Sequence, residues 1–221
     1  MKRILYHGSP NIIEKPIYGF GNKQNDYGLG FYCTTSKTLA KEWASKRTGF
    51  GYVNSYSFRD DNYKILDLTA PSYNNVLYWV ALLMSNREIS DELKTKFPRE
   101  LKYLEDNYLI DISKYDIVIG FRADDSYFQF PEAFVRSEIT LSSLESIFKA
   151  GELGKQYVLM SERAFKNLKF IEYFESTQES KKDYYSRKNN ADKSFKELLE
   201  RDRYSSETKL RDLIIHEKDK N

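Results

Sequence analysis

Apolar and polar residues alternate in short runs over the first third of the chain, which is the pattern of β-strands joined by turns. Three runs rich in aromatic and β-branched residues predict strands, at residues 4–7, 52–58 and 63–68. The first run stops at Gly8-Ser9-Pro10, a turn signal. β-Structure is therefore expected to dominate residues 1–70.

Apolar residues recur at helical spacing in other parts of the chain. Residues 36–46 form one such stretch, with Ser36 in place for an N-cap. Residues 71–113 are predicted to be helical, with an apolar face over 76–84 and a second helix that begins at Pro98. Strands are expected to dominate again over residues 114–174, with one short helix among them. The expected strands are 115–121, 156–160 and 169–174, and the expected helix is 161–168.

The last part of the chain differs sharply in composition. Residues 178–221 contain no glycine or proline and many charged residues. Apolar residues recur there in two groups at helical spacing, which predicts two amphipathic helices separated by Ser205-Ser206. The chain is thus divided into a domain of residues 1–174 and a charged helical C-terminal extension of residues 175–221. The extension either packs on the domain or serves as a partner-binding arm.

Short strands mixed with unevenly spaced helices predict an α+β fold rather than a doubly wound parallel sheet. The composition agrees with a globular protein, because 14 Phe and 18 Tyr among 221 residues are not typical of a disordered chain. The 35 Lys and Arg residues nearly balance the 33 Asp and Glu residues, which leaves a formal net charge of +2. Overall charge therefore gives no reason to expect binding to nucleic acids or membranes.

The few cysteine and histidine residues restrict the chemistry. Cys33 is the single cysteine, so neither an internal disulfide nor a cysteine-rich zinc site is expected. His216 has no metal-ligating neighbours at suitable spacing, and no metal is expected. The apolar stretch in the first residues is too short for the core of a signal peptide. The longest apolar run, residues 76–84, is shorter than the ~20 residues that span a membrane. A cytoplasmic location is expected.

His7 and a glycine–aromatic segment are the first candidates for a functional site. A histidine at the end of a strand brings two polar ring nitrogens that need partners. Residues 26–35 alternate small and aromatic side chains, and Gly28 and Gly30 allow another group to approach the backbone closely. The alternative is a glycine-kinked hairpin strand. No glycine-rich turn of the dinucleotide-binding type opens a helix here.

Four segments in this order resemble the ADP-ribosyltransferase superfamily, namely His7-Gly8-Ser9 and residues 27–32, 36–43 and 156–159. The resemblance covers residues 3–174 and is to the His–Tyr–Glu branch, which includes diphtheria-toxin-like enzymes and poly(ADP-ribose) polymerases. It is strongest to bacterial ADP-ribosyltransferase-like domains, some of which are thought to be toxins of toxin–antitoxin or anti-phage pairs. It implies a split mixed or antiparallel β-sheet core with flanking helices, and NAD as co-substrate.

The resemblance also implies roles for individual residues. His7 would hydrogen-bond the adenosine-side ribose of NAD, Gly8 would hold the nicotinamide amide through its backbone, and Ser9 belongs to the same binding motif. Tyr32 would stack against the nicotinamide ring. Trp43 would close the other side of that ring, because a flat ring is held well between two aromatic faces.

Gln156 departs from the family's pattern, which usually has glutamate at this place. The carboxylate would hydrogen-bond the nicotinamide ribose and offset the positive charge that develops when the glycosidic bond breaks. Glutamine keeps the hydrogen bond and lacks the charge, and losing one such contact costs on the order of 10²–10³ in rate. Gln156 therefore favours mono-transfer over polymer synthesis. Glu152 is another carboxylate, in a turn where related enzymes present their acceptor.

Arg122 begins a polar cluster, Arg122-Ala123-Asp124-Asp125, directly after an expected strand. Its guanidinium could make a bidentate contact to the pyrophosphate of NAD. The alternative is a turn with an Asx-type cap.

The leading interpretation is an NAD-dependent mono-ADP-ribosyltransferase with His7, Tyr32 and Gln156 as catalytic residues. It would be a bacterial toxin or anti-phage effector that modifies a protein or a nucleic acid and has a cognate antitoxin. One alternative is a non-catalytic module that binds NAD or ADP-ribose, and another is an NAD glycohydrolase, which transfers the ribosyl group to water. Replacing Gln156 with Glu is expected to raise NAD turnover in a competent enzyme. In a non-catalytic binding module the same change is expected to produce no NAD turnover.

Overall fold

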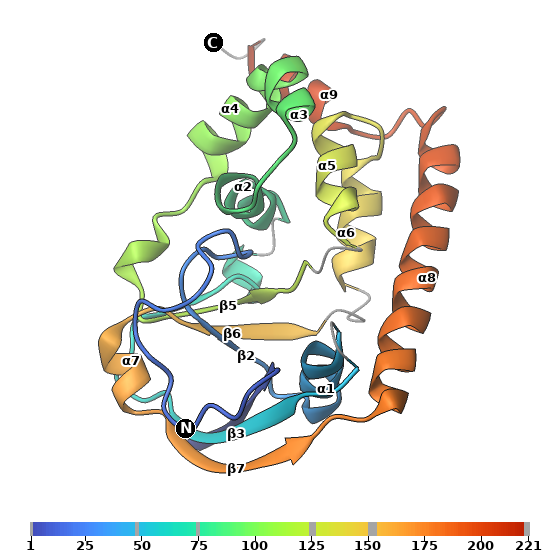
Figure 1. Ribbon diagram of the computed structural model, residues 1–221. Coiled ribbons are helices and arrows are strands. Elements are labelled where there is room, and N and C mark those ends of the chain that lie inside the picture. Colours follow the sequence, from blue (N-terminus) through green and yellow to red (C-terminus); the bar gives the residue numbers. More distant parts are fainter. Residues whose placement is uncertain (1, 47–48, 74–75, 124–126, 150–153, 219–221) are drawn as a thin grey trace.

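The computed structural model describes residues 2–46, 49–73, 76–123, 127–149 and 154–218 (Figure 1). It contains two β-sheets and a group of helices packed above the mixed sheet, and two helices follow the last strand. The predicted α+β class is confirmed, and the expected split sheet core is present as one antiparallel and one mixed sheet.

The antiparallel sheet joins the beginning of the chain to the last strand. Its order is β1 (Lys2–Ser9), β3 (Tyr52–Arg59) and β7 (Lys169–Glu175). β3 lies in the centre and pairs with β1 over its whole length, with His7 opposite Asn54. All three strands were predicted, at residues 4–7, 52–58 and 169–174.

The mixed sheet has four strands in the order β2 (Phe31–Cys33), β6 (Lys155–Leu159), β5 (Ile117–Phe121) and β4 (Ile65–Asp67). β4 and β5 are parallel, and the other neighbours are antiparallel. An isolated bridge between Tyr6 and Thr34 connects β1 to the end of β2. The two sheets therefore meet next to His7.

α1 (Lys37–Ser45) packs against β1, and a glycine makes this packing close. A Cβ atom on Gly8 would lie 2.0 Å from the carbonyl oxygen of Ala40 and 2.9 Å from Cβ of Trp43. The helix begins where predicted, because the Ser36 side chain accepts a hydrogen bond from the N–H of Leu39. Gly8 thus lets α1 lie directly on the strand that carries His7.

Helices cover the mixed sheet on the side that faces away from the antiparallel sheet (Figure 1). Those nearest the sheet are α2 (Val76–Asn86), α5 (Gln129–Val135) and α6 (Leu141–Lys149), and α3 (Asp91–Lys96) and α4 (Pro98–Tyr108) lie beyond α2. Short elements complete this part of the chain: the 3-10 turns Pro71–Tyr73 and Ile112–Lys114, and α7 (Glu162–Lys166).

The prediction that strands dominate residues 114–174 is wrong for the stretch that forms α5 and α6. Phe130, Ala133 and Phe134 are completely buried and recur at helical spacing, and Leu144 and Phe148 continue the pattern on α6. This period of three to four residues is the helical signal. The strands before and after the two helices lie where they were expected.

The mixed sheet separates two apolar cores, because successive side chains of a strand point to opposite faces. On β5, Val118 belongs to the core under the helices. Its neighbours Ile117 and Ile119 belong to the core shared with the antiparallel sheet. The first core contains the buried helix α2, and the second contains Phe31 of β2 and Tyr56 of β3.

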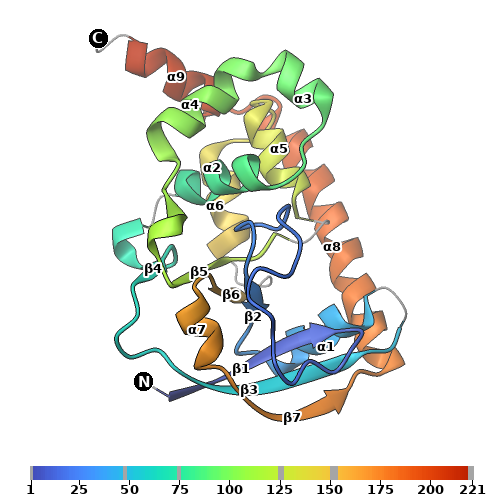
Figure 2. The same ribbon diagram turned by 60° about the vertical axis from the view of Figure 1, so that its left-hand side comes forward.

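The two predicted C-terminal helices are α8 (Gln178–Asp202) and α9 (Leu210–Lys218), with Ser205-Ser206 between them. α8 runs along one side of the molecule, from the antiparallel sheet to the upper helices (Figure 2). Ala191, Leu210 and Ile214 are buried in the same core as α2. In the described parts of the chain, no helix has both the length and the apolar character needed to cross a membrane.

Candidate functional site

A cleft of about 580 Å³ opens where the two sheets meet. Its walls come from β1, β2, β6, α1 and the residues that follow α2 and β5. The irregular segment of residues 10–30, which connects β1 to β2, forms a further wall and crosses the front of the molecule in Figure 2. Side chains from distant parts of the sequence therefore converge on one space.

The cleft brings together most of the residues that the sequence singled out. Lining residues among them are His7, Gly8, Tyr32, Trp43, Arg122 and Gln156. Ser9 lies outside the lining. Its hydroxyl donates to the carbonyl oxygen of Asn11 and accepts from the N–H of Asn11 at 3.1 Å, so it shapes the turn after β1.

His7 is held at the end of β1 by a hydrogen bond across the junction of the two sheets. Its Nδ1 lies 2.7 Å from the carbonyl oxygen of Tyr32, and its ring centroid lies 4.4 Å from that of Phe31. A carbonyl only accepts, so Nδ1 carries the proton and Nε2 of the neutral ring is an acceptor. Burial lowers the pKa of His7 below its ordinary value of 6.5, which favours this neutral form.

Tyr32 is oriented by the backbone of the glycine–aromatic segment. Its hydroxyl donates to the carbonyl oxygen of Gly28 at 2.6 Å and accepts from the N–H of Tyr27 at 3.1 Å. Gly28 has a φ of +69°, a backbone conformation that favours glycine. Burial raises the pKa of the Tyr32 hydroxyl, so Tyr32 presents a neutral ring to the cleft.

Trp43 and Arg122 form a stacked pair in the cleft wall. The guanidinium carbon of Arg122 lies 4.8 Å from the ring centroid of Trp43, within the range of a cation–π contact. The indole Nε1 of Trp43 is buried, and the described residues offer it no hydrogen-bond acceptor. Buried N–H donors in proteins usually have a hydrogen-bond acceptor, and the described residues supply none for Nε1 of Trp43.

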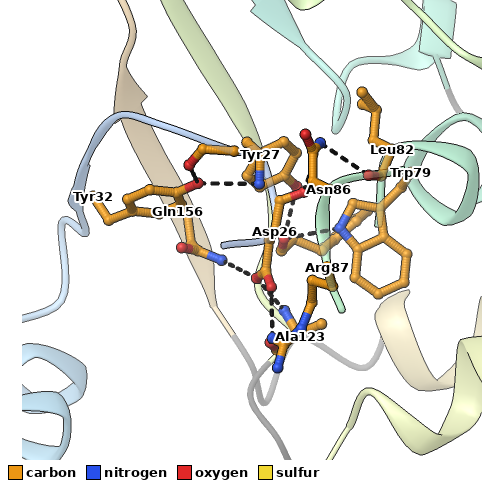
Figure 3. A network of polar contacts seen from close by, with 11 residues as sticks. Asp26, Tyr27, Tyr32, Trp79, Leu82, Asn86, Arg87, Ala123 and Gln156 are labelled. Atoms are coloured by element: carbon orange, nitrogen blue, oxygen red, sulfur yellow. Dashed lines mark hydrogen bonds and ion pairs between the residues drawn. The ribbon is translucent and has the colours of Figure 1, made fainter. Parts of the chain in front are cut away.

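Gln156 lies on β6 and is almost completely buried, with 4% of its surface exposed. Its Nε2 donates to Oδ2 of Asp26 at 2.8 Å, as Figure 3 shows. This bond fixes the orientation of the amide, because the nitrogen must face the carboxylate. The side-chain oxygen of Gln156 is then turned away from Asp26.

Asp26 is the centre of a buried network at the back of the cleft (Figure 3). Besides Gln156, its carboxylate accepts from Nη1 of Arg87 at 2.9 Å and from the N–H of Ala123 at 2.8 Å. Burial raises the pKa of the Asp26 carboxyl, and Arg87 together with the two other donors acts in the opposite direction. All three partners donate N–H groups, so the arrangement fits the ionised carboxylate.

A second set of contacts supports this network from the side of the helices. The hydroxyl of Tyr27 donates to the carbonyl oxygen of Phe121 at 2.7 Å, and Nε1 of Trp79 donates to the same oxygen at 3.0 Å. A Cβ atom on Gly120 would lie 2.0 Å from the Tyr27 hydroxyl. These contacts fasten the segment that carries Asp26 to the end of β5.

The sequence did not single out Asp26 and Arg87 as site residues. Asp26 begins the glycine–aromatic segment, and its position there was the only signal in the sequence. Arg87 directly follows α2, 61 residues away from Asp26, and no motif marks it. Only the packing of α2 on the mixed sheet brings this guanidinium to the cleft.

The charge of the cleft differs from that of the whole chain. Lys15, Lys46, Arg87 and Arg122 line it, and Asp26 is the one acidic residue in the described part of its lining. Such an excess of basic groups suits a ligand with negatively charged phosphates. Three acidic residues considered from the sequence, Glu152, Asp124 and Asp125, lie outside the described residues.

Metal-ligating side chains do not gather in the described parts of the structure, where no group of three or more His, Cys, Asp or Glu residues could hold an ion. Cys33 is buried, and burial raises the pKa of its thiol. Among the described residues, the cleft is therefore the candidate site for chemical activity.

Comparison with known proteins identifies one family. The family model described as a protein of unknown function (DUF3990) matches residues 3–170, about three quarters of the chain. The match includes all the described residues that line the cleft. No curated protein and no solved structure matches the chain.

Proposed function

The chain belongs to the DUF3990 family, and from the geometry of its cleft we propose that it is an NAD-dependent mono-ADP-ribosyltransferase. The observation that carries this proposal is the convergence of His7, Tyr32, Trp43 and Gln156 in one cleft. These are the residues on which the resemblance to the His–Tyr–Glu branch of ADP-ribosyltransferases rests. They come from four separate elements, so their convergence is not a consequence of closeness in the sequence.

The residues present fit an NAD molecule. The cleft volume of about 580 Å³ lies within the range of small-molecule and cofactor sites. Nε2 of His7 is an acceptor for a ribose hydroxyl, and the rings of Tyr32 and Trp43 offer flat apolar surfaces for nicotinamide. Arg122 and Lys46 supply positive charge for the pyrophosphate.

The proposed reaction is the transfer of the ADP-ribosyl group to an acceptor. Bound NAD would supply the bond between ribose C1′ and the nicotinamide nitrogen, which breaks with its electron pair leaving on nicotinamide. An acceptor atom would bond to C1′ and release its proton to the solvent. The side-chain oxygen of Gln156 would hydrogen-bond the nicotinamide ribose and steady it during this step. His7 and the Gly8 backbone would orient the dinucleotide.

The acceptor class is inferred from the chemistry of Gln156. A chain-elongating enzyme must activate a ribose hydroxyl of the growing polymer, and the amide of Gln156 cannot act as a base. We therefore propose a single transfer to a protein side chain or a nucleobase. In this interpretation the protein is a cytoplasmic bacterial toxin or anti-phage effector with a cognate antitoxin.

A labelling experiment tests the proposal. Purified protein is incubated with NAD labelled in its adenylate part and with bacterial lysate, and the products are treated separately with protease and nuclease. Label on a macromolecule that is absent with the His7→Ala variant would support the transferase, and the digestion that removes it would identify the acceptor class. Release of free ADP-ribose without labelling would indicate a glycohydrolase. Binding of NAD without cleavage would overturn the enzymatic proposal in favour of a binding module.

A further inference from the structure

We propose that Asp26 is a positioning residue that supplies, through Gln156, the carboxylate charge that position 156 itself lacks. This inference rests on the proposed function and names the group that compensates for the departure from glutamate. Asp26 and Gln156 lie on different elements, 130 residues apart in the sequence, and act as one unit in the cleft. Both side chains line the cleft, so the unit lies where a ribose would bind.

The first step of the argument is the orientation of the amide. Because Nε2 of Gln156 donates to Asp26 at 2.8 Å, Oε1 points away from the carboxylate (Figure 3). Among the described residues, none hydrogen-bonds this oxygen. An acceptor is thus held in a buried wall of the cleft, in the place where the resemblance puts the glutamate that binds the nicotinamide ribose.

The second step concerns the charge. Asp26 is 5% exposed, and in a buried environment a charge acts more strongly on its neighbours than in water. A hydrogen bond from the amide to an anion shifts electron density toward Oε1, which makes that oxygen a stronger acceptor. Arg87 lies on the other carboxylate oxygen, so the negative end of the ion pair faces Gln156.

The third step is that positions 26 and 156 together can hold only one ionised carboxylate. A glutamate at position 156 would bring a second anion within hydrogen-bond distance of Asp26. Two carboxylates that share one site cannot both ionise readily, so one of them would hold a proton near neutral pH. Replacing Gln156 alone with the glutamate of the ADP-ribosyltransferase pattern should therefore impair the site at pH values at which this proton is lost. This reverses the expectation from the sequence that Gln156→Glu raises turnover.

The test is an exchange of the two groups in the full-length protein. The rate of NAD cleavage is measured for the wild type, Asp26→Asn, Gln156→Glu and the double variant, together with thermal stability. Asp26→Asn should lower kcat on the order of 100-fold and change KM by less than about threefold, because the missing charge acts on the transition state. The double variant should recover at least about 10-fold of this loss, since one carboxylate again faces one amide. Asp26→Asn and the double variant both lack the carboxylate that accepts from the N–H of Ala123. The difference in kcat between these two variants therefore reports on position 156 alone.

The pH dependence of Gln156→Glu gives a second, independent measurement. The activity of this variant should fall below that of the wild type at pH 8 and rise as the pH is lowered and the shared proton binds. The pH measurement on Gln156→Glu does not require that the Asp26→Asn variant folds. Gln156→Glu with a kcat above that of the wild type at pH 8 would overturn the inference.

The outcomes separate the two proposals. An active wild type with an equally active Asp26→Asn variant would overturn the role of Asp26 and leave the transferase in place. The same conclusion follows from a double variant that is no more active than Asp26→Asn. A wild type that cleaves no NAD would overturn the proposed function, and the role of Asp26 with it.

Discussion

Arg187 of α8 forms a buried ion pair with Glu42 of α1, in which Nε of Arg187 lies 3.0 Å from Oε2 of Glu42. Only 12% and 8% of the two side chains are exposed. Glu42 directly precedes Trp43 in the helix that lines the cleft. α8 therefore holds α1, the helix that carries Trp43, one of the proposed nicotinamide contacts.

Replacing Arg187 with Ala should lower the free energy of unfolding by about 3–5 kcal/mol, because the Glu42 carboxylate remains buried without its cation. Urea or thermal unfolding measures this change. Lys193→Ala is the matched control on the same helix. Its ion pair with Glu197 is exposed, and its removal should change stability by less than about 0.5 kcal/mol. Equal effects of the two variants would contradict the structural role of the Arg187–Glu42 pair.

Deleting residues 175–221 should prevent the remaining chain from folding cooperatively. The deletion removes Ala191, Leu210 and Ile214 from the core that contains α2, and exposes the apolar surface they cover. Near-ultraviolet circular dichroism and a urea titration of the 1–174 fragment measure the outcome. A fragment with a sharp unfolding transition and intact NAD binding would show instead that the extension is a separable domain.

Replacing Gly8 with Ala should cost about 3 kcal/mol and weaken NAD binding. The added Cβ would lie 2.0 Å from the Ala40 oxygen and 2.7 Å from the Ala44 nitrogen, and these backbone atoms yield only if α1 moves away from β1. Gly49→Asn is the control. Its φ of +82° is accessible to asparagine and its Cβ would meet only flexible side chains, so its cost should be about 1 kcal/mol. A Gly8→Ala variant as stable as the wild type would contradict the close packing of α1 on β1.

Much of the fold could be predicted from the sequence where local patterns and packing agree. The strands of the antiparallel sheet, the helix that Ser36 caps and the two C-terminal helices were all predicted close to their observed bounds. α5 and α6 were missed although Phe130 and Phe134 recur at helical spacing. The strands on either side of this stretch favour one continuous β-region, whereas the period within the stretch itself is helical.

The candidate site was predictable only where a motif marked it. His7, Tyr32 and Gln156 belong to segments with a recognisable order, and they share the cleft. Asp26 and Arg87 contribute through one buried ion pair that depends on how α2 packs on the mixed sheet. No local pattern encodes such a contact between distant residues, so the partner of Gln156 could be found only in three dimensions.

Burial of His7 makes protein stability depend on pH in a defined direction. Its pKa is lowered in the folded protein, so the unfolded chain binds the proton first as the pH falls below the ordinary value of 6.5. The free energy of unfolding should therefore decrease as the pH falls from about 6.5 through the lowered pKa of the folded state. Unfolding measured between pH 7 and 5 should show a smaller decrease for His7→Asn than for the wild type. Identical slopes would contradict the lowered pKa of His7 in the folded protein.

The same shift should appear in catalysis. Neutral His7 offers Nε2 as an acceptor, and the lowered pKa keeps the ring neutral to a lower pH than that at which a free imidazole takes up its proton. KM for NAD should therefore stay constant down to a pH below 6.5 and rise only beyond that point. A KM that rises with a midpoint at 6.5 or above would show that His7 is solvated in the free enzyme.

Phe20 at the edge of the cleft is expected to contribute to recognition of the acceptor. Its ring lines the cleft and yet is 77% exposed, so it is available to an apolar or aromatic group of a bound macromolecule. If the protein is a transferase, Phe20→Ser should lower labelling of the macromolecule about 10-fold, since an aromatic contact contributes on the order of 1–3 kcal/mol. Cleavage of NAD by water should continue, because the residues that hold the dinucleotide are unchanged.

Tyr204→Ser is the matched control for Phe20. Tyr204 is 87% exposed and lies between α8 and α9, outside the described lining of the cleft. Both substitutions remove an exposed aromatic ring, so each should change stability by less than about 0.5 kcal/mol. Labelling that falls with Phe20→Ser alone would place the acceptor at this edge of the cleft. Equal labelling by the two variants, or an equal loss of NAD cleavage and labelling with Phe20→Ser, would contradict a role in recognising the acceptor.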